Sequence, residues 1–344
     1  MTTTDGVEKL PTAFDLHYVW RYETARRELR DLYEKAKGAQ WDAAKALPWD
    51  LEVDPDKAQF PDESIPIYGS AQWAKLTEDE IKTVRHELGA WTLSQFLHGE
   101  QGALLATAQI VTAVPSMDAK LYASTQVVDE ARHVEVYDRY LREKIGTGYP
   151  VSEHLKSLLD VILEDTRWDM KYLGMQLMVE GLALAAFGLI HRFSDEPLLK
   201  EIVHLVMRDE ARHVAFGVIG LRGIYEEMSP SELRDREDFI IEGSRLMRDR
   251  FLAQEVWEKM GMPVDECVEY ATNAPSIVFF RSLLFSKIVP NLKRLGLLTP
   301  YVRPHLAQLG VLQFESFDPD ADQDAIDSSF VFAGRHEAAP PAAE

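Results

Sequence analysis

The six residues DEARHV occur twice in this chain, at an offset of 80 positions. Each copy contains a glutamate and a histidine three residues apart, Glu130 with His133 and Glu210 with His213. Residues at i and i+3 share one face of a helix, so each copy presents a carboxylate beside an imidazole. Oxygen ligands combined with imidazoles suit iron or manganese better than a metal that prefers sulfur.

Each copy is preceded by another glutamate at the same distance, Glu100 before Glu130 and Glu180 before Glu210. Every neighbour of Glu180 within one turn, except Gln176, is apolar or glycine. A buried carboxylate without a partner costs several kcal/mol or becomes protonated, and a bound metal removes that penalty. The duplication therefore predicts two helix pairs that direct four carboxylates and two imidazoles at one dinuclear metal site.

An aspartate precedes each motif glutamate, and an arginine follows two residues after it: Asp129 with Arg132, and Asp209 with Arg212. A metal-bound histidine normally donates its second ring N–H to a carboxylate or a carbonyl. We expect the two aspartates and two arginines to support the ligands in this way. The alternative is a pair of surface salt bridges.

The pattern E…ExxH…E…ExxH, with DE-x-RH twice, resembles the ferritin-like di-iron carboxylate superfamily over about residues 75–228. It is most similar to the oxygen-activating branch, which includes bacterial multicomponent monooxygenases, acyl-carrier-protein desaturases, p-aminobenzoate N-oxygenases and the small subunit of class I ribonucleotide reductase. The resemblance implies two Fe ions, with Mn/Fe possible, and an O₂-dependent oxidation of a substrate. It implies these metal ligands: Glu100, Glu130, His133, Glu180, Glu210 and His213.

Two departures bear on the reaction. The p-aminobenzoate N-oxygenases have an extra histidine ligand four residues before the second motif glutamate, where this chain has Val206, which argues against arylamine N-oxygenation. Tyr137 occupies the position of the radical tyrosine of the ribonucleotide reductase subunit, but no tyrosine follows Tyr301 to serve radical transfer near the C-terminus. Tyr137 is therefore a candidate catalytic residue only, and packing on its helix is the alternative.

Small residues surround both lone glutamates, which predicts either a substrate cavity or close helix contacts. They are Gly99, Gly102, Ala103 and Ala106 near Glu100, and Gly181, Ala183, Ala185 and Ala186 near Glu180. If they leave a cavity, its wall is expected to be mostly apolar and to include Phe96, Thr107, Met175, Met178 and Phe187.

The elements that must position these residues are long helices. Apolar periodicity, capping boxes at Thr77 and Ser229, and breaks at proline and glycine predict helices over 14–45, 77–114, 117–144, 152–192, 197–227, 231–260 and 264–286. No run with strand periodicity occurs, so we predict an all-α fold, a ferritin-like long four-helix bundle with additional N- and C-terminal helices.

We predict four parts of the chain. They are an N-terminal helix and loop extension packed on the bundle (1–74), the four-helix bundle (75–228), additional helices of the same domain (229–315) and an acidic tail expected to be disordered (316–344).

The composition limits the partners. The chain of 344 residues carries 57 acidic and 37 basic residues, a formal net charge of −20, which argues against binding nucleic acid or an anionic membrane. Its single cysteine, Cys267, allows no internal disulfide, and no cysteine-based cluster is expected. The N-terminus lacks the apolar segment of a secretory signal, so we expect a cytoplasmic protein.

Together these features predict an O₂-activating dinuclear iron oxidoreductase, an oxidase or monooxygenase acting on a small or medium, mostly apolar organic substrate. The chain has no GxGxxG motif and no cysteine cluster, so electrons would come from a separate reductase or ferredoxin. A homodimer is possible. The alternatives are a radical-generating subunit of the ribonucleotide reductase type and a ferroxidase or iron-handling protein that does not form a cage.

Overall fold

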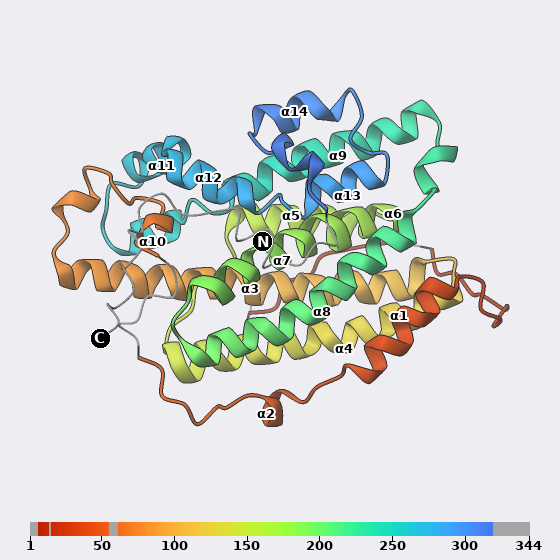
Figure 1. Cartoon of the computed structure of the whole chain (residues 1–344), viewed down its shortest axis with the longest axis horizontal. Helices are drawn as coiled ribbons and strands as arrows, with labels where there is room; N and C mark the ends of the chain where they lie inside the picture. Colours follow the sequence, from red (N-terminus) through yellow and green to blue (C-terminus); the bar gives the residue numbers. More distant parts are fainter. Residues whose placement is uncertain (1–5, 14, 55–60, 319–344) are drawn as a thin grey trace, which may run out of the picture.

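The computed structural model describes residues 6–13, 15–54 and 61–318, and these contain helices but no β-strand (Figure 1). Two antiparallel pairs form the core: α3 (Glu78–Ala113) packs on α4 (Met117–Tyr140), and α7 (Glu180–Phe193) packs on α8 (Pro197–Leu221). The predicted all-α fold with a ferritin-like bundle is confirmed.

The ends of the bundle helices follow the predicted signals. Thr77 and Glu80 form a capping box at the start of α3, in which the Thr77 backbone N–H donates to Glu80 at 2.8 Å. Helix α3 ends at Ala113, two residues before Pro115. Ser229 and Glu232 form a second capping box at the start of α9 (Pro230–Asp249). These caps satisfy backbone donors that a helix start would leave free.

Two predicted helices that begin before α7 are wrong in extent. The first was expected from residue 14, but α1 begins at Arg27, because the backbone N–H groups of Ala25 and Arg26 both donate to the Asp118 carboxylate at 2.9 Å. The predicted helix over 152–192 is broken after α5 (Glu153–Glu164), where Asp165 accepts a hydrogen bond from the Arg167 backbone at 2.8 Å. Such a turn competes with helical hydrogen bonding.

The C-terminal helices are also shorter than predicted, because the chain turns sharply at several points. Ala253 adopts a left-handed φ of 53° between α9 and α10 (Gln254–Lys259). The predicted helix over 264–286 is divided into α11 (Val264–Asn273) and α12 (Pro275–Leu283), with proline beginning the second. Two further helices follow, α13 (Ile288–Arg294) and α14 (Val302–Gln308).

The segment before α7 is wound more loosely than an α-helix. After α6 (Trp168–Lys171), a π-helical stretch η4 (Tyr172–Val179) leads directly into Glu180. Gly217 and Gly220 of α8 face this stretch, and a Cβ atom at Gly220 would lie 2.4 Å from the Tyr172 ring. Only glycine therefore allows α8 to approach η4 this closely. Wide turns of this kind occur often beside functional residues.

The remaining helices cover the two pairs. Helix α1 (Arg27–Gly38) packs across α4 and α8, α5 packs on α3 and α9, and the C-terminal helices form a layer beyond α5 and α7 (Figure 1). Buried apolar residues from all of these segments form one cluster. The predicted boundaries at 74 and 228 remain predictions, and most of the expected acidic tail lies outside the described residues.

One helical run among the described residues, Trp168–Phe193, is long and apolar enough to cross a membrane. However, 94% of its most apolar window is buried inside the protein. That burial is what a central helix of a bundle shows, so the run gives no support for a membrane span.

Candidate metal centre

Four helices bring the six predicted ligands to one place inside the bundle. Glu100 comes from α3, Glu130 and His133 from α4, Glu180 from α7, and Glu210 and His213 from α8. None of the six is more than 5% exposed. The fixed spacing of the repeat explains this convergence, because each helix pair carries two glutamates and one histidine at matching positions along its helices.

The first half of the cluster gathers around His133. Its Nδ1 atom lies 3.2 Å from Glu100 Oε2, 3.4 Å from Glu130 Oε2 and 3.1 Å from Glu210 Oε1. One ligand atom from each of these four residues lies within 4.8 Å of the others. That spacing fits a single metal ion with oxygen and nitrogen ligands.

The second half gathers around His213. Its Nδ1 atom lies 3.2 Å from both Glu130 Oε1 and Glu210 Oε2, and 3.9 Å from Glu180 Oε2. The His133 and His213 rings lie 5.9 Å apart, centre to centre. Glu130 and Glu210 therefore reach both histidines, each with one oxygen toward either side, whereas Glu100 and Glu180 each reach one.

The aspartates beside the motif glutamates are paired across the repeat. His133 Nε2 lies 3.2 Å from Asp209, and His213 Nε2 lies 3.4 Å from Asp129, so each histidine faces the aspartate of the other copy. The histidine–aspartate pairs thus join the two copies, whereas each arginine also pairs with the aspartate of its own copy. The exchange follows from antiparallel packing of α4 and α8, which sets each motif opposite its duplicate.

The two arginines hold these aspartates in place. Arg132 donates to Asp129 at 2.5 Å and to Asp209 at 3.0 Å, and Arg212 pairs with both as well. All four side chains are at least 85% buried, so surface salt bridges are excluded as their role. Buried pairs of this kind are rigid and are held by several hydrogen bonds at once.

Two residues of this network were not found from the sequence. Gln40 donates to Asp129 at 2.7 Å, and the Trp41 indole donates to Asp209 at 2.8 Å. Both come from the segment that follows α1, and Trp41 also lies under the Arg132 guanidinium, 4.6 Å away. Neither residue belongs to a motif or to the repeat, so the sequence carries no signal for them.

Without metal, the cluster holds protons where ligands are expected. Burial, together with the charge of Glu210, raises the pKa of Glu100 to about 8. Burial, together with Glu130, also raises the pKa of Glu180 well above its usual range. For Glu210, burial alone would raise the pKa, but the charge of His213 and hydrogen bonds to the carboxylate lower it.

The histidines are affected in the opposite way. Burial alone would lower their pKa values, but the carboxylates outweigh it, Glu100 foremost for His133 and Glu130 foremost for His213. Both histidines therefore have pKa values well above the usual range. A metal ion displaces these protons, because it binds carboxylate and neutral imidazole.

Unsatisfied oxygen atoms also fit a metal. Glu130 Oε2 and Glu210 Oε1 are fully buried and have no hydrogen-bond partner among the described residues. Gln126, one turn before Glu130, donates to Glu130 at 2.8 Å, but its own Oε1 is likewise unpartnered. Buried oxygens without donors are rare in folded proteins and need an explanation, which two bound cations would supply.

A cavity adjoins the two lone glutamates, which we name the inner cavity. It has an empty volume of about 330 Å³, part of it open to solvent. Its lining includes Gly99, Glu100, Ala103, Glu180, Ala183, Phe96, Phe187 and Arg250. The predicted apolar wall is thus present in part.

Other members of the predicted wall point elsewhere. Thr107 and Met175 do not line the inner cavity, and the Met178 side chain faces Gly243 of α9. Gly102 serves a close contact, because a Cβ atom there would lie 2.5 Å from Leu159. Small residues near the ligands therefore serve both purposes that the sequence left open.

Tyr137 lies on α4 and Val206 on α8, the two helices that carry the repeated motif. Tyr137 is buried between Phe96 and Phe187, at 6.1 and 5.9 Å between ring centres, and its hydroxyl has no partner among the described residues. Val206 is fully buried one turn before Glu210. An aliphatic side chain cannot bind a metal, so this face of α8 contributes only Glu210 and His213.

Comparison with known proteins gives one family and several similar folds. Residues 23–296 match the family of p-aminobenzoate N-oxygenase AurF. No match is found among curated protein sequences.

Solved structures of an R2-like ligand-binding oxidase are similar in fold. A single-residue variant with an anaerobically reconstituted Mn/Fe cofactor is 20% identical, with a TM-score of 0.48 over 77% of this chain and 92% of that chain. Another structure, with an aerobically reconstituted Mn/Fe cofactor, is 19% identical, with a TM-score of 0.43 over 85% and 93% of the two chains. Similarity of this degree concerns the fold and does not indicate a shared reaction.

The family match spans the helices that supply the repeat, the two lone glutamates and the paired aspartates. The chain therefore belongs to the p-aminobenzoate N-oxygenase AurF family and is an O₂-activating oxidoreductase with a dinuclear iron cofactor.

Proposed function

We propose that the chain oxidises a small or medium, mostly apolar organic substrate with O₂, using electrons from a separate reductase or ferredoxin. The two metal ions would be held by Glu100, Glu130, His133, Glu180, Glu210 and His213. One observation supports this most directly: two ligand groups, each within 4.8 Å, share Glu130 in the dry centre of the bundle.

The distances suggest a different role for each carboxylate. Glu130 and Glu210 would help to hold both ions, because each reaches both histidines. Glu100 would complete the ion beside His133, and Glu180 the ion beside His213. Two iron ions bound there supply the O₂ chemistry that no side chain of the chain can perform.

The paired aspartates would fix the histidines for this task. Each accepts from the Nε2 side of one imidazole, so Nδ1 is left to face the metal. Arg132 and Arg212 pair with the aspartates, and Gln40 and Trp41 close the network from outside. The protein thus orients the ligands and excludes water from them.

The substrate would enter through the inner cavity, where Phe96 and Phe187 give an apolar wall beside Glu100 and Glu180. With Val206 in place of a further histidine, we propose oxidation of an apolar organic molecule rather than of an arylamine nitrogen. The radical-generating alternative is not favoured, because the Tyr137 hydroxyl has no partner among the described residues to carry a proton away. The ferroxidase alternative is not favoured either, because the helices that follow residue 228 make this chain longer than a subunit of a ferritin cage.

The function can be tested on protein reconstituted with Fe(II) without oxygen and then exposed to ¹⁸O₂ and a reductase. We expect oxygen consumption coupled to an oxidised organic product. Glu210→Ala should lose both metal and turnover, whereas Glu201→Ala, which changes an exposed glutamate of the same helix, should keep both. Turnover of many irons per chain would instead support iron handling, and full turnover of the Glu210→Ala protein would refute the site.

A further inference from the structure

Arg281 is a buried cation that lacks part of its hydrogen bonding. It lies on α12, is 4% exposed, and donates from Nη2 to the Thr272 carbonyl at 2.7 Å. Its Nε and Nη1 atoms are fully buried without a hydrogen-bond partner in the described part of the chain. An arginine offers five N–H donors in a planar fork that matches a carboxylate, so a buried fork with free donors is prepared for an anion.

The nearby charges do not satisfy this group. Burial, and then the charge of Arg248, lower the pKa of Arg281, and only Asp249 opposes them. Asp249 is itself engaged by Arg248, with an Nε–Oδ1 distance of 2.6 Å. The guanidinium is therefore desolvated, and the surrounding residues compensate its charge only in part.

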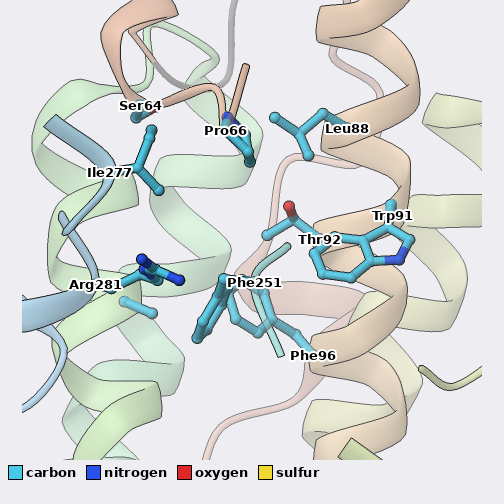
Figure 2. Close-up of a pocket in the computed structure, with 10 residues that line it drawn as sticks. Ser64, Pro66, Leu88, Trp91, Thr92, Phe96, Phe251, Ile277 and Arg281 are labelled. Atoms are coloured by element: carbon cyan, nitrogen blue, oxygen red, sulfur yellow. The ribbon is translucent and has the colours of Figure 1, made fainter. Parts of the chain in front are cut away.

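The guanidinium points into a pocket that we name the outer pocket (Figure 2). Its empty volume is about 540 Å³, part of it open to solvent. The wall opposite Arg281 is formed by Leu88, Trp91 and Phe96, with Phe251 beside the guanidinium. Except for Ser64, Thr92 and Arg281, every lining side chain is apolar or aromatic. A ligand that fits would have one anionic group and an apolar body.

The outer pocket adjoins the inner cavity beside the metal centre. Phe96 lines both the outer pocket and the inner cavity, and its ring meets Phe187 at 4.9 Å between centres. On α7 the lining passes from Ala186 of the outer pocket to Ala183 and Glu180 of the inner cavity. Phe96 therefore borders both cavities, and the two lie next to each other along α3 and α7.

Helix α3 lines both cavities and gives the separation between them. Thr92 lies in the outer pocket and Glu100 in the inner cavity, which separates them by about 12 Å along α3 at the usual rise per residue. A molecule held at Arg281 must span a distance of that order to reach the metal carboxylates. A single benzoate ring is too short to do so.

We propose that the substrate is an elongated apolar carboxylic acid, held with its carboxylate on Arg281 and its apolar body running past Phe96 to the metal centre. This inference rests on the proposed function, and it adds the substrate class and the residue that selects it. Arg281 is then a specificity-determining residue that lies far from the reacting atoms.

Another buried guanidinium offers the competing site. Arg250 is 5% exposed, lines the inner cavity beside Glu100 and Glu180, and has an unpartnered Nε. An anion held there would lie directly against the metal carboxylates and would need no long body. Short and long acids therefore distinguish the two sites.

The test is calorimetric binding to the metal-loaded protein, so its result does not depend on turnover. The probes are saturated carboxylates from butanoate to dodecanoate, their methyl esters, and p-aminobenzoate. We expect affinity to rise with chain length, and the long acids to bind more tightly than their esters. Arg281→Met should weaken the long acids by about 10- to 100-fold, the effect of losing a charge-assisted hydrogen bond, and should leave the esters unchanged.

Arg245→Met is the matched control, since Arg245 is exposed on α9 and paired with Glu242. Equal binding of long acids and esters to the unaltered protein would overturn the proposal without any variant. If p-aminobenzoate binds more tightly than the long acids, and Arg250→Met weakens its binding but Arg281→Met does not, the anion site lies at Arg250 in the inner cavity and not at Arg281. If long acids bind as expected but are not oxidised with O₂ and reductant, the acid is not the substrate, and only the anion site on Arg281 stands.

Discussion

Replacing Glu100 by glutamine in the metal-free protein should change how stability depends on pH. The pKa of Glu100 rises from 4.5 to about 8 in the folded protein, because the carboxyl group is buried beside Glu210. Between these values the folded state binds one proton more than the unfolded state. The free energy of unfolding therefore falls as pH rises through this window, by about 1.4 kcal/mol per unit.

The size of the effect follows from the same values. Between pH 5 and 8, Glu100 alone should remove about 3–4 kcal/mol from the stability of the metal-free protein. Glutamine does not titrate, so the Glu100→Gln protein should lack this loss. The raised pKa values of His133 and His213 also make stability fall above pH 6.5. His213 acts alike in both proteins, whereas His133 loses the charge of Glu100 in the variant, so its smaller contribution adds to the difference in the same direction.

The assay is urea unfolding of chelator-treated protein at several pH values from 5 to 8. Glu135→Gln is the control, because Glu135 is exposed on the same bundle. We expect the control to follow the unaltered protein and the Glu100→Gln protein to gain on both as pH rises. Parallel curves for all three proteins would show that Glu100 is not a protonated, buried carboxyl, and the electrostatic argument for a metal site would fail.

Three other predictions follow from the site. Metal should raise the melting temperature measured by calorimetry, because it should add about 4 kcal/mol to the free energy of unfolding when free metal exceeds its dissociation constant 1,000-fold. Equal melting temperatures with and without metal would argue against a site in the core. Glu180→Ala should weaken metal binding in a competition titration yet leave the metal-free protein as stable or more stable, since it removes a buried carboxyl whose pKa is raised; a large loss of metal-free stability would contradict this. Tyr137→Phe should keep both metals and turnover within about tenfold, the cost of one hydrogen bond. A loss of about 1,000-fold with both metals still bound, together with the disappearance of a tyrosyl EPR signal that the unaltered protein shows, would favour a radical-generating subunit.

The bundle and its six central side chains could be predicted because the information is local and repeated. Helix spacing places Glu130 with His133, and the duplication supplies their counterparts without any knowledge of tertiary structure. The cross-pairing of Asp129 and Asp209 could not be predicted in this way. It depends on which helices face each other, which no single motif encodes.

Other features required tertiary contacts. The start of α1 is decided by Asp118, which takes two backbone N–H groups that a longer helix would have used itself. Gln40 and Trp41 reach the aspartates from a loop, so neither periodicity nor spacing indicates them. The role of Arg281 could not be predicted from the sequence either, because only the folded chain shows that its Nε and Nη1 donors are buried without a partner among the described residues.

The metal content of the protein tests the central claim most directly. Protein reconstituted with Fe(II), or with Mn(II) and Fe(II), and freed of excess metal should contain close to two ions per chain by elemental analysis. The Glu130→Ala protein should fall well below two, because Glu130 belongs to both ligand groups. One ion or none in the well-loaded unaltered protein would contradict the dinuclear site.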